Sequence, residues 1–535
     1  MFNDDQITIK TSRQFFNKSQ IIALGLGIAL LGLHVFFLKP YHLFAAGIDD
    51  SYISYHYAQN LFNGYGFRFN ADGERVEGFT SFLWVINLAA AQSLGFDLTK
   101  AGPTLGICYT VITLIILLYW INALGGTRSN LMSSSIIMMS SPLVAYWAAS
   151  GMDTSLFSML LTLSVCMATI KPLNNKSACL LGTILILTGM ARPEGVMIAI
   201  ILFMCLFIAA LREKSPIKPV IIAVSTFVLL GAIYFSWRVN YFGYWLPNTF
   251  YAKVSSNPRQ VLTGVRFIYE YALANGQFLL AMPLLLVFRH FRHSIHTVLA
   301  ILGFYFIYLI VEGGDTLSHP YFRYISPLWP LFTLLMVQFL DVCSSTSEAY
   351  IDPSKHTSIA LKQTAISAFV VFLCAFWFFR PSLTNASSRF NDSWGTYRNE
   401  QQLIKVAAWF NRNSKEGETM AVTLAGIFPY YTGLHTIDML GLNDTIIAHM
   451  KAPNMGTGQK GHERSFPKEV LRRKPTYVIL KRPLTNQPIQ STDYTNAIDA
   501  IRDVYLEESF HTDYEHRSIK IEDKYFNFYQ RRQGH

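Results

Sequence analysis

The stretch Gly47-Ile48-Asp49-Asp50-Ser51-Tyr52 follows closely on an apolar segment, Ser19–Leu38, near the start of the chain. Two adjacent carboxylates at a membrane surface are costly, because each charge must be solvated, paired or bound to a metal. Their presence beside apolar segments therefore favours a chemical role for Asp49 and Asp50. A helix cap or an acidic loop start is the simpler alternative.

Composition sets the class of protein around this stretch. The chain has 535 residues, of which 51% are hydrophobic and 15% charged, whereas soluble domains carry about a quarter charged residues. We therefore expect a polytopic α-helical membrane protein. The net charge of +10 does not indicate nucleic-acid binding, because the lysines and arginines punctuate apolar segments as topology signals do. The six cysteines show no CxxC spacing, which favours packing over metal binding.

Charge at the first apolar segment predicts the orientation of the chain. Lys10, Arg13 and Lys18 precede Ser19–Leu38, so the N-terminus is expected in the cytoplasm and the two aspartates on the far side. Further apolar segments lie at 103–124, 130–149, 153–170, 178–191, 194–211, 217–237, 276–289, 295–311, 324–341 and 359–379. Phe79–Leu94 is shorter than the roughly 20 residues of a span, and only as an interfacial helix does it leave every strongly basic loop in the cytoplasm. This interpretation gives about eleven spans.

The composition changes after the last apolar segment. Residues 395–535 carry frequent charges, with short apolar runs that indicate strands at Met420–Leu424 and Tyr477–Leu480. We expect a membrane domain at 1–380, with an acidic first outer loop at 39–102, and a soluble extracytoplasmic α/β domain at 381–535.

With this orientation, the polar clusters of the chain fall on one face, opposite the cytoplasm. They comprise Asp49, Asp50, His56, Glu77, Asp153, Arg192, Glu194, Trp245, Asn248, Lys253, Asp315, Arg323 and, in the C-terminal domain, His462 and Glu463. One water-facing site assembled from several loops is the economical explanation. Simpler alternatives remain open for three of them: Glu77 neutralises Arg75, and Arg192 and Glu194 form an ion pair at the membrane edge.

Motifs of soluble enzymes are absent from the sequence. It contains no P-loop, no GxSxG, no HExxH and no paired CxxC. A nucleotide-sugar transferase usually brings a nucleotide-binding domain of its own, and the predicted outer domain is too small for one. A donor that arrives through the lipid is therefore favoured.

Ordered sequence islands carry a resemblance to a known family. They are Asp49-Asp50-Ser51-Tyr52-Ile53, Gly64-Tyr65-Gly66, Val76-Glu77-Gly78, Gly151-Met152-Asp153-Thr154, Arg192-Pro193-Glu194-Gly195, Trp245-Leu246-Pro247-Asn248-Thr249, Gly313-Gly314-Asp315, Asp438-Met439-Leu440-Gly441-Leu442-Asn443-Asp444 and Gly461-His462-Glu463. The chain resembles GT-C-type glycosyltransferases, and most closely the terminal β-(1→2)-arabinofuranosyltransferases and their relatives that modify bacterial pilins. It departs from that pattern at His56, where an arginine is expected, and at Asp153, where a glutamate is expected.

The resemblance implies an inverting transferase of the bacterial inner membrane, with its site on the periplasmic side. The donor would be a polyprenyl-phosphate sugar, the acceptor a glycan, lipid or pilin, and nucleic acid no partner. Asp49 would be the general base, while Asp50 would orient the acceptor, bind a divalent cation or itself be the base. Lys253, Arg192 and Arg323 would compensate the charge of the phosphate, and the remaining polar residues above would contact donor or acceptor.

Two alternatives stay open. One is a GT-C enzyme that uses another lipid-linked sugar, such as mannose, aminoarabinose or an oligosaccharide; the match at Trp245–Thr249 favours arabinofuranose. The other is a non-catalytic transporter of lipid-linked sugars. A transporter is expected to place ionisable groups near mid-membrane, whereas here they cluster at the ends of the spans.

Overall fold

The structure is a computed structural model of the 535-residue chain. It describes residues 17–38, 48–254, 257–287, 293–315, 322–348, 387–453, 455–456, 460–480, 484–488, 494 and 497–532.

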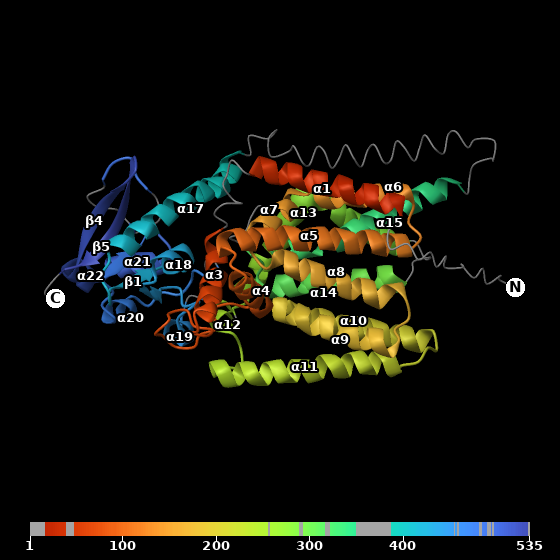
Figure 1. Ribbon diagram of the computed structural model, residues 1–535, viewed down its shortest axis with the longest axis horizontal. Coiled ribbons are helices and arrows are strands. Elements are labelled where there is room, and N and C mark those ends of the chain that lie inside the picture. Colours follow the sequence, from red (N-terminus) through yellow and green to blue (C-terminus); the bar gives the residue numbers. More distant parts are fainter. Residues whose placement is uncertain are drawn as a thin grey trace.

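Long helices run side by side and form most of the molecule, with a small sheet at one end of the bundle (Figure 1). They are α1 (Lys18–Leu38), α5 (Leu98–Ala123), α6 (Arg128–Met139), α7 (Pro142–Ala149), α8 (Thr154–Ile170), α9 (Asn175–Ala191), α10 (Glu194–Arg212), α11 (Lys218–Phe242), α13 (Arg259–Val287), α14 (His293–Glu312) and α15 (Trp329–Glu348). Shorter elements gather near the sheet: α3 (Asp49–Phe62), α4 (Phe82–Ser93), α12 (Asn248–Lys253) and the 3₁₀ turn η2 (Ser326–Leu328).

Several helices have the length and composition of membrane spans. Five of those described are long and apolar enough to cross a membrane, and six if α6 and α7, bent by 59° at their junction, count as one span. The bend falls where Pro142 opens α7, because proline cannot continue the hydrogen bonding of the preceding helix. The predicted span at 359–379 lies outside the described residues, so the number of eleven spans stays a prediction.

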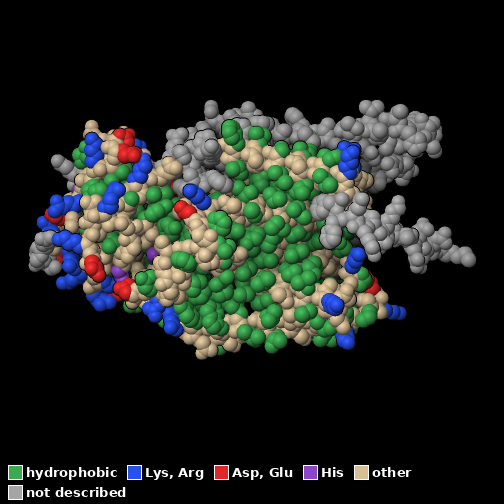
Figure 2. Space-filling view, viewed as in Figure 1, with side chains coloured by type: hydrophobic (Ala, Val, Ile, Leu, Met, Phe, Trp, Pro, Cys, Tyr) green, Lys and Arg blue, Asp and Glu red, His purple; other side chains and the backbone are tan. Residues whose placement is uncertain are grey.

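The surface of the bundle is that of a protein in lipid. Figure 2 shows hydrophobic side chains over most of the visible helical part and charged side chains gathered at its two ends. On α11, Val228, Leu229 and Ile233 are 57–63% exposed, and a row of such side chains on one helix is typical of a lipid-facing surface. The α8–α9 and α10–α11 connections, whose lysines and arginines predict a cytoplasmic location, lie at the end away from the sheet (Figure 1).

Helix α4 corresponds to the segment that the sequence assigns to the membrane interface. It has 12 residues, so at about 1.5 Å per residue it is about 18 Å long, well short of the roughly 30 Å of the hydrocarbon core. It packs against α3 and α5. A helix of this length cannot span the membrane on its own.

The C-terminal region contains a five-stranded sheet with the order β2-β1-β3-β5-β4. Its strands are β1 (Thr419–Val422), β2 (His435–Asp438), β3 (Tyr477–Ile479), β4 (Tyr514–Ile521) and β5 (Lys524–Arg531). The first three are parallel, while β5 is antiparallel to β3 and β4. The helices of this region are α17 (Ser387–Asn413), α18 (Ile427–Thr432), α19 (Thr445–His449), α20 (Pro467–Arg472), α21 (Asp499–Leu506) and α22 (Glu508–Asp513). The predicted boundary at residue 381 lies outside the described residues.

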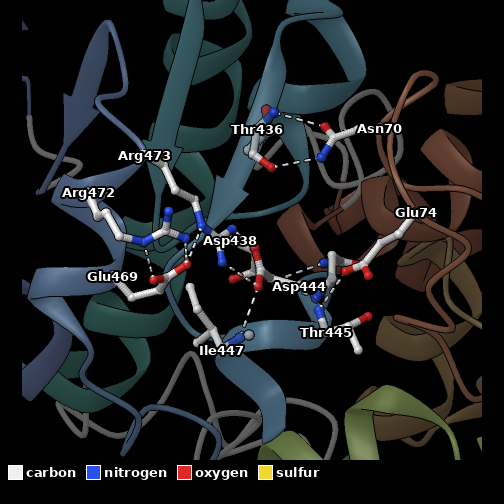
Figure 3. A network of polar contacts seen from close by, with 12 residues as sticks. Asn70, Glu74, Thr436, Asp438, Asp444, Thr445, Ile447, Glu469, Arg472 and Arg473 are labelled. Carbon is white, nitrogen blue, oxygen red and sulfur yellow. Dashed lines mark hydrogen bonds and ion pairs between the residues drawn. The ribbon is translucent and has the colours of Figure 1, made fainter. Parts of the chain in front are cut away.

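Polar contacts fasten this sheet to the segment between α3 and α4 (Figure 3). Asn70 Oδ1 accepts the N–H of Thr436 at 2.8 Å, and its Nδ2 donates to the carbonyl of the same residue at 3.0 Å. The Glu74 carboxylate accepts the N–H of Thr445 at 2.9 Å. Together these bonds fix the segment between α3 and α4 against β2 and the start of α19.

Candidate functional site

A cavity of about 770 Å³ lies where α3, the starts of α10 and α12, the end of α14 and the loops of the sheet meet. Predicted residues that line it are Asp49, Asp50, Asp153, Arg192, Glu194, Lys253, Asp315, Arg323 and His462. They come from seven separate segments of the sequence. The cavity therefore collects most of the polar clusters that the sequence places on one face.

Asp49 is held by the C-terminal region rather than by its own helix. The N-cap of α3 is Ile48, and no side chain caps that helix, so the helix-cap alternative does not describe either aspartate. Instead, Asp49 Oδ1 accepts the N–H of Ile427 at 3.0 Å, and the Asp49 N–H donates to Glu400 Oε1 at 3.3 Å. Asp49 is buried. One oxygen of its carboxylate is thus fixed at the start of α18.

Asp50 faces a different partner. Consecutive residues of an α-helix project about 100° apart, and the Asp50 side chain is 52% exposed. Its Oδ2 accepts from Arg323 Nη1 at 3.1 Å, while Arg323 Nε lies 3.8 Å from Asp315 Oδ2. Arg323 therefore bridges Asp50, in the first turn of α3, and Asp315, which follows α14.

A second, buried cluster surrounds Arg192. Its Nε donates to Asp153 Oδ2 at 2.8 Å, and its Nη1 lies 3.4 Å from Glu194 Oε1. The predicted ion pair at the end of α9 is thus present and also lines the cavity. The ring of Tyr324 has the guanidinium of Arg192 at 5.5 Å and that of Arg323 at 5.3 Å from its centroid, so an aromatic ring shared by two cations links both clusters.

Lys253 brings a cation of a different kind to the cavity. Among the described residues, no carboxylate oxygen lies within 4 Å of its ammonium. Burial lowers the pKa of Lys253, and the nearby positive charge of Arg323 lowers it further, whereas the negative charges of Asp50 and Asp315 partly offset this shift. A Cβ added at Gly461 would lie 3.4 Å from Lys253 Cε, so the lysine stem packs against the loop that carries His462.

The other predicted residues lie outside the cavity lining. Glu77 forms a buried ion pair with Arg238, 2.9 Å from Oε1 to Nε. Asn248 Nδ2 donates to the carbonyls of Gly441 and Leu442. The remaining members are His56, which is buried against Phe69, Trp245, which is 69% exposed, and Glu463, which is buried. Burial lowers the pKa of His56 to about 4, so its imidazole is neutral at pH 7. The structure places Glu77 and Asn248 as braces of the walls.

Several residues of the cavity escaped the sequence analysis. Glu400, Glu312, Lys460 and Gln260 line it, and Lys460 Nζ pairs with the Glu312 carboxylate and donates to its carbonyl at 2.6 Å. Two of them carried a local signal, because Glu312 directly precedes Gly313-Gly314-Asp315 and Lys460 directly precedes Gly461-His462-Glu463. Glu400 and Gln260 lie outside the islands that the sequence analysis singled out.

Within the part of the chain that the structure describes, no group of three or more His, Cys, Asp or Glu side chains is arranged to hold a metal ion. A divalent cation at Asp50 stays a prediction.

Solved structures similar to this chain identify its fold. The apo form of ArnT from Cupriavidus metallidurans matches with a TM-score of 0.55 and 10% identity over 95% of this chain and 97% of that chain. The same protein bound to undecaprenyl phosphate matches with a TM-score of 0.52 and 9% identity over 80% of this chain and 87% of that chain. The Archaeoglobus fulgidus oligosaccharyltransferase tethered with an acceptor peptide matches with a TM-score of 0.51 and 11% identity over 96% of this chain and 74% of that chain. The chain therefore has the fold of the GT-C glycosyltransferases, which makes it a multi-pass membrane protein.

The sequence comparisons are sparser. The family model described as "Domain of unknown function (DUF8728)" matches residues 393–529, which hold all five strands of the sheet. No curated protein matches the chain.

Proposed function

We propose that this protein is an inverting membrane glycosyltransferase that moves a sugar from a polyprenyl-phosphate donor to an acceptor hydroxyl on the extracytoplasmic side. The observation that carries the proposal is one cavity in a GT-C fold that holds two first-loop carboxylates together with Arg323 and Lys253. A displacement at a sugar phosphate needs a base for the nucleophile and positive charge for the leaving group. The cavity contains both.

Asp49 is our candidate for the base. The acceptor oxygen attacks the anomeric carbon while the bond from that carbon to the phosphate oxygen breaks, and the phosphate keeps the electron pair. The proton of the acceptor hydroxyl passes to Asp49. A single displacement with one base and no covalent intermediate inverts the anomeric configuration. The N–H of Ile427 donates to Asp49 Oδ1, which holds the carboxylate at the cavity where the acceptor hydroxyl would lie.

Lys253 is our first candidate for the phosphate. Arg192 is enclosed by two carboxylates and Arg323 already bridges two others, so both would have to share their charge. Among the described residues, Lys253 forms no ion pair within 4 Å, although the charges of Asp50 and Asp315 act on it from farther away. An ammonium suits a phosphate as a point charge, and its loss should cost a factor of about 10²–10³ in kcat if it stabilises the departing group.

An apolar wall gives the lipid a route to this cavity. Met197, Leu246, Phe250, Tyr308 and Val311 contribute to the lining, and Leu246, Phe250 and Val311 are also 39–60% exposed on the outside. A surface that is both cavity lining and lipid-facing suits a prenyl chain whose phosphate must reach Lys253. The structural neighbour with bound undecaprenyl phosphate supports a carrier of this class.

The sugar and the acceptor rest on the sequence islands. We propose arabinofuranose as the sugar and a glycan, lipid or pilin as the acceptor, at the periplasmic side of a bacterial inner membrane. The basic connections at the far end of the bundle support this orientation. The second candidate is transfer of another lipid-linked sugar or a whole oligosaccharide, which the similarity to an oligosaccharyltransferase favours.

The proposal is tested with purified protein in detergent, a panel of synthetic polyprenyl-phosphate sugars and an arabinoside acceptor. Transfer from the arabinofuranose donor supports the proposal as stated. Transfer from another donor in the panel keeps the transferase and refutes arabinofuranose. Binding of polyprenyl phosphate with no transfer from any donor favours the non-catalytic transporter.

A further inference from the structure

In the region of unknown function, residues 393–529, the carboxyl ends of β1 and β2 face the cavity. The lining includes Thr423, Leu424 and Ala425, which follow β1, and Leu440 and Leu442, which follow β2. β1 lies between β2 and β3, so the chain leaves β1 to one side and later returns to its other side. Ligands of open α/β sheets bind outside the carboxyl ends of the strands at such a reversal of strand order.

The loop after β1 also contacts Asp49, the candidate base. A Cβ added at Gly426 would overlap the carbonyl oxygen of Asp49 and lie 2.9 Å from its carboxyl carbon. The φ of Gly426 is −100°, so glycine is required there by close approach and not by backbone conformation. The next residue, Ile427, donates its N–H to Asp49. The loop after β1 therefore fixes the position of the Asp49 carboxylate.

Glu400 adds a carboxylate on the same side. It lies on α17, is 2% exposed, lines the cavity and accepts the Asp49 N–H at 3.3 Å. The Glu400 carboxylate does not suit a phosphate, because both groups are negatively charged. A carboxylate accepts hydrogen bonds from hydroxyl groups, and here it stands beside the base that must receive a hydroxyl proton.

We infer that the region of unknown function forms the acceptor side of the cavity, where Glu400 and the loop 423–426 bind a polyhydroxylated acceptor next to Asp49. The inference rests on the proposed transferase function and adds the location and chemistry of the acceptor subsite. Donor and acceptor are thereby divided between the two parts of the chain. Lys253 and Arg323 of the helical part receive the sugar phosphate, and the sheet region presents the hydroxyl.

The first test is Glu400→Gln, with Glu522→Gln as the matched control. Glutamine keeps an acceptor for the Asp49 N–H but loses the charge that strengthens a bond to an acceptor hydroxyl. A hydrogen bond to a charged group is worth about a factor of 10–150 in affinity. We therefore expect the KM for the acceptor to rise by about 10-fold or more, with unchanged binding of polyprenyl phosphate. Glu522 is exposed and pairs with Lys405 outside the cavity, so its variant should match the wild type.

The second test is Gly426→Ala. The added methyl group must displace Asp49, so kcat should fall by about 10-fold or more, while polyprenyl phosphate still binds and shows that the protein is folded. An acceptor KM that is the same in Glu400→Gln as in Glu522→Gln would overturn the subsite. An unchanged kcat in Gly426→Ala would overturn the fixing of Asp49 by this loop.

The two proposals fail in different ways. If the wild type transfers no sugar from any donor, the proposed function fails. Direct binding of the arabinoside acceptor, measured by calorimetry on the wild type and Glu400→Gln, still decides the inference. Equal acceptor affinity in both proteins refutes it, and weaker binding in the variant supports it.

Discussion

Substitution of Glu77 shows whether this residue stabilises the wall of the cavity through its ion pair with Arg238 or contacts the ligand. Glu77 and Arg238 are each about 6% exposed in their side chains, and Glu77 Oε1 lies 2.9 Å from Arg238 Nε. Removing one partner of a buried ion pair costs about 3–5 kcal/mol, because the other charge stays buried without compensation. Glu77→Gln keeps a hydrogen-bond acceptor, so we expect a loss near the lower end, about 3 kcal/mol in the free energy of unfolding.

The assay is denaturant unfolding of the purified protein in detergent, followed by tryptophan fluorescence. Glu270→Gln is the control, because Glu270 pairs with Arg266 on the surface, where the arginine is 79% exposed, and such pairs are worth about 0–1 kcal/mol. The double variant Glu77→Leu with Arg238→Leu should recover much of the stability, since no charge then remains buried. Unchanged stability in Glu77→Gln together with a raised KM would refute the brace and restore Glu77 as a ligand contact.

Three further outcomes follow from the structure. Lys253→Met should lower kcat by a factor of about 10²–10³ with little effect on stability, and a kcat within twofold of wild type would exclude the lysine from the reaction. As pH rises, wild-type activity should begin to fall before the ordinary lysine pKa of about 10.4 is reached, because the pKa of Lys253 is lowered. Burial raises the pKa of Asp438 from 3.8 to about 6, so its contribution to stability is full below pH 3.8 and is lost as pH rises through 6. That loss is at most about 3 kcal/mol, and a melting temperature of the sheet region that does not fall between pH 4 and 7 relative to Asp438→Asn would contradict it. Gly78→Ala should destabilise by about 1–3 kcal/mol, because a Cβ there would overlap Asn443 Oδ1, whereas Gly303→Ala, which meets nothing within 4 Å, should be neutral or stabilising in the same thermal assay.

The sequence was informative where chemistry is local. Asp49 and Asp50, Arg192 with Glu194, and Asp315 with Arg323 stand in short polar runs beside apolar segments, and the structure brings them to one cavity. The orientation rule places such runs on one side of a membrane whatever their detailed packing. That is why several separate loops could be predicted to share one face.

The partners of these residues could not be predicted, because they are set by tertiary packing. Glu400 is 351 positions from Asp49 and Arg238 is 161 positions from Glu77, and nothing in either local sequence marks the pairing. The surroundings of Trp245 were equally hidden from the sequence. Its ring is 69% exposed and lies 5.9 Å from that of Phe235, and its carbonyl accepts a hydrogen bond from Arg238. Its predicted role in sugar binding stays a prediction.

The stereochemistry of transfer tests the central claim most directly. A donor of defined anomeric configuration is incubated with the wild type and with folded Asp49→Asn, and the new linkage is assigned by NMR. We predict a product of inverted configuration from the wild type and a loss of about 10²-fold or more in rate for Asp49→Asn. A product of retained configuration, or an Asp49→Asn protein as active as the wild type, would contradict single displacement with Asp49 as the base.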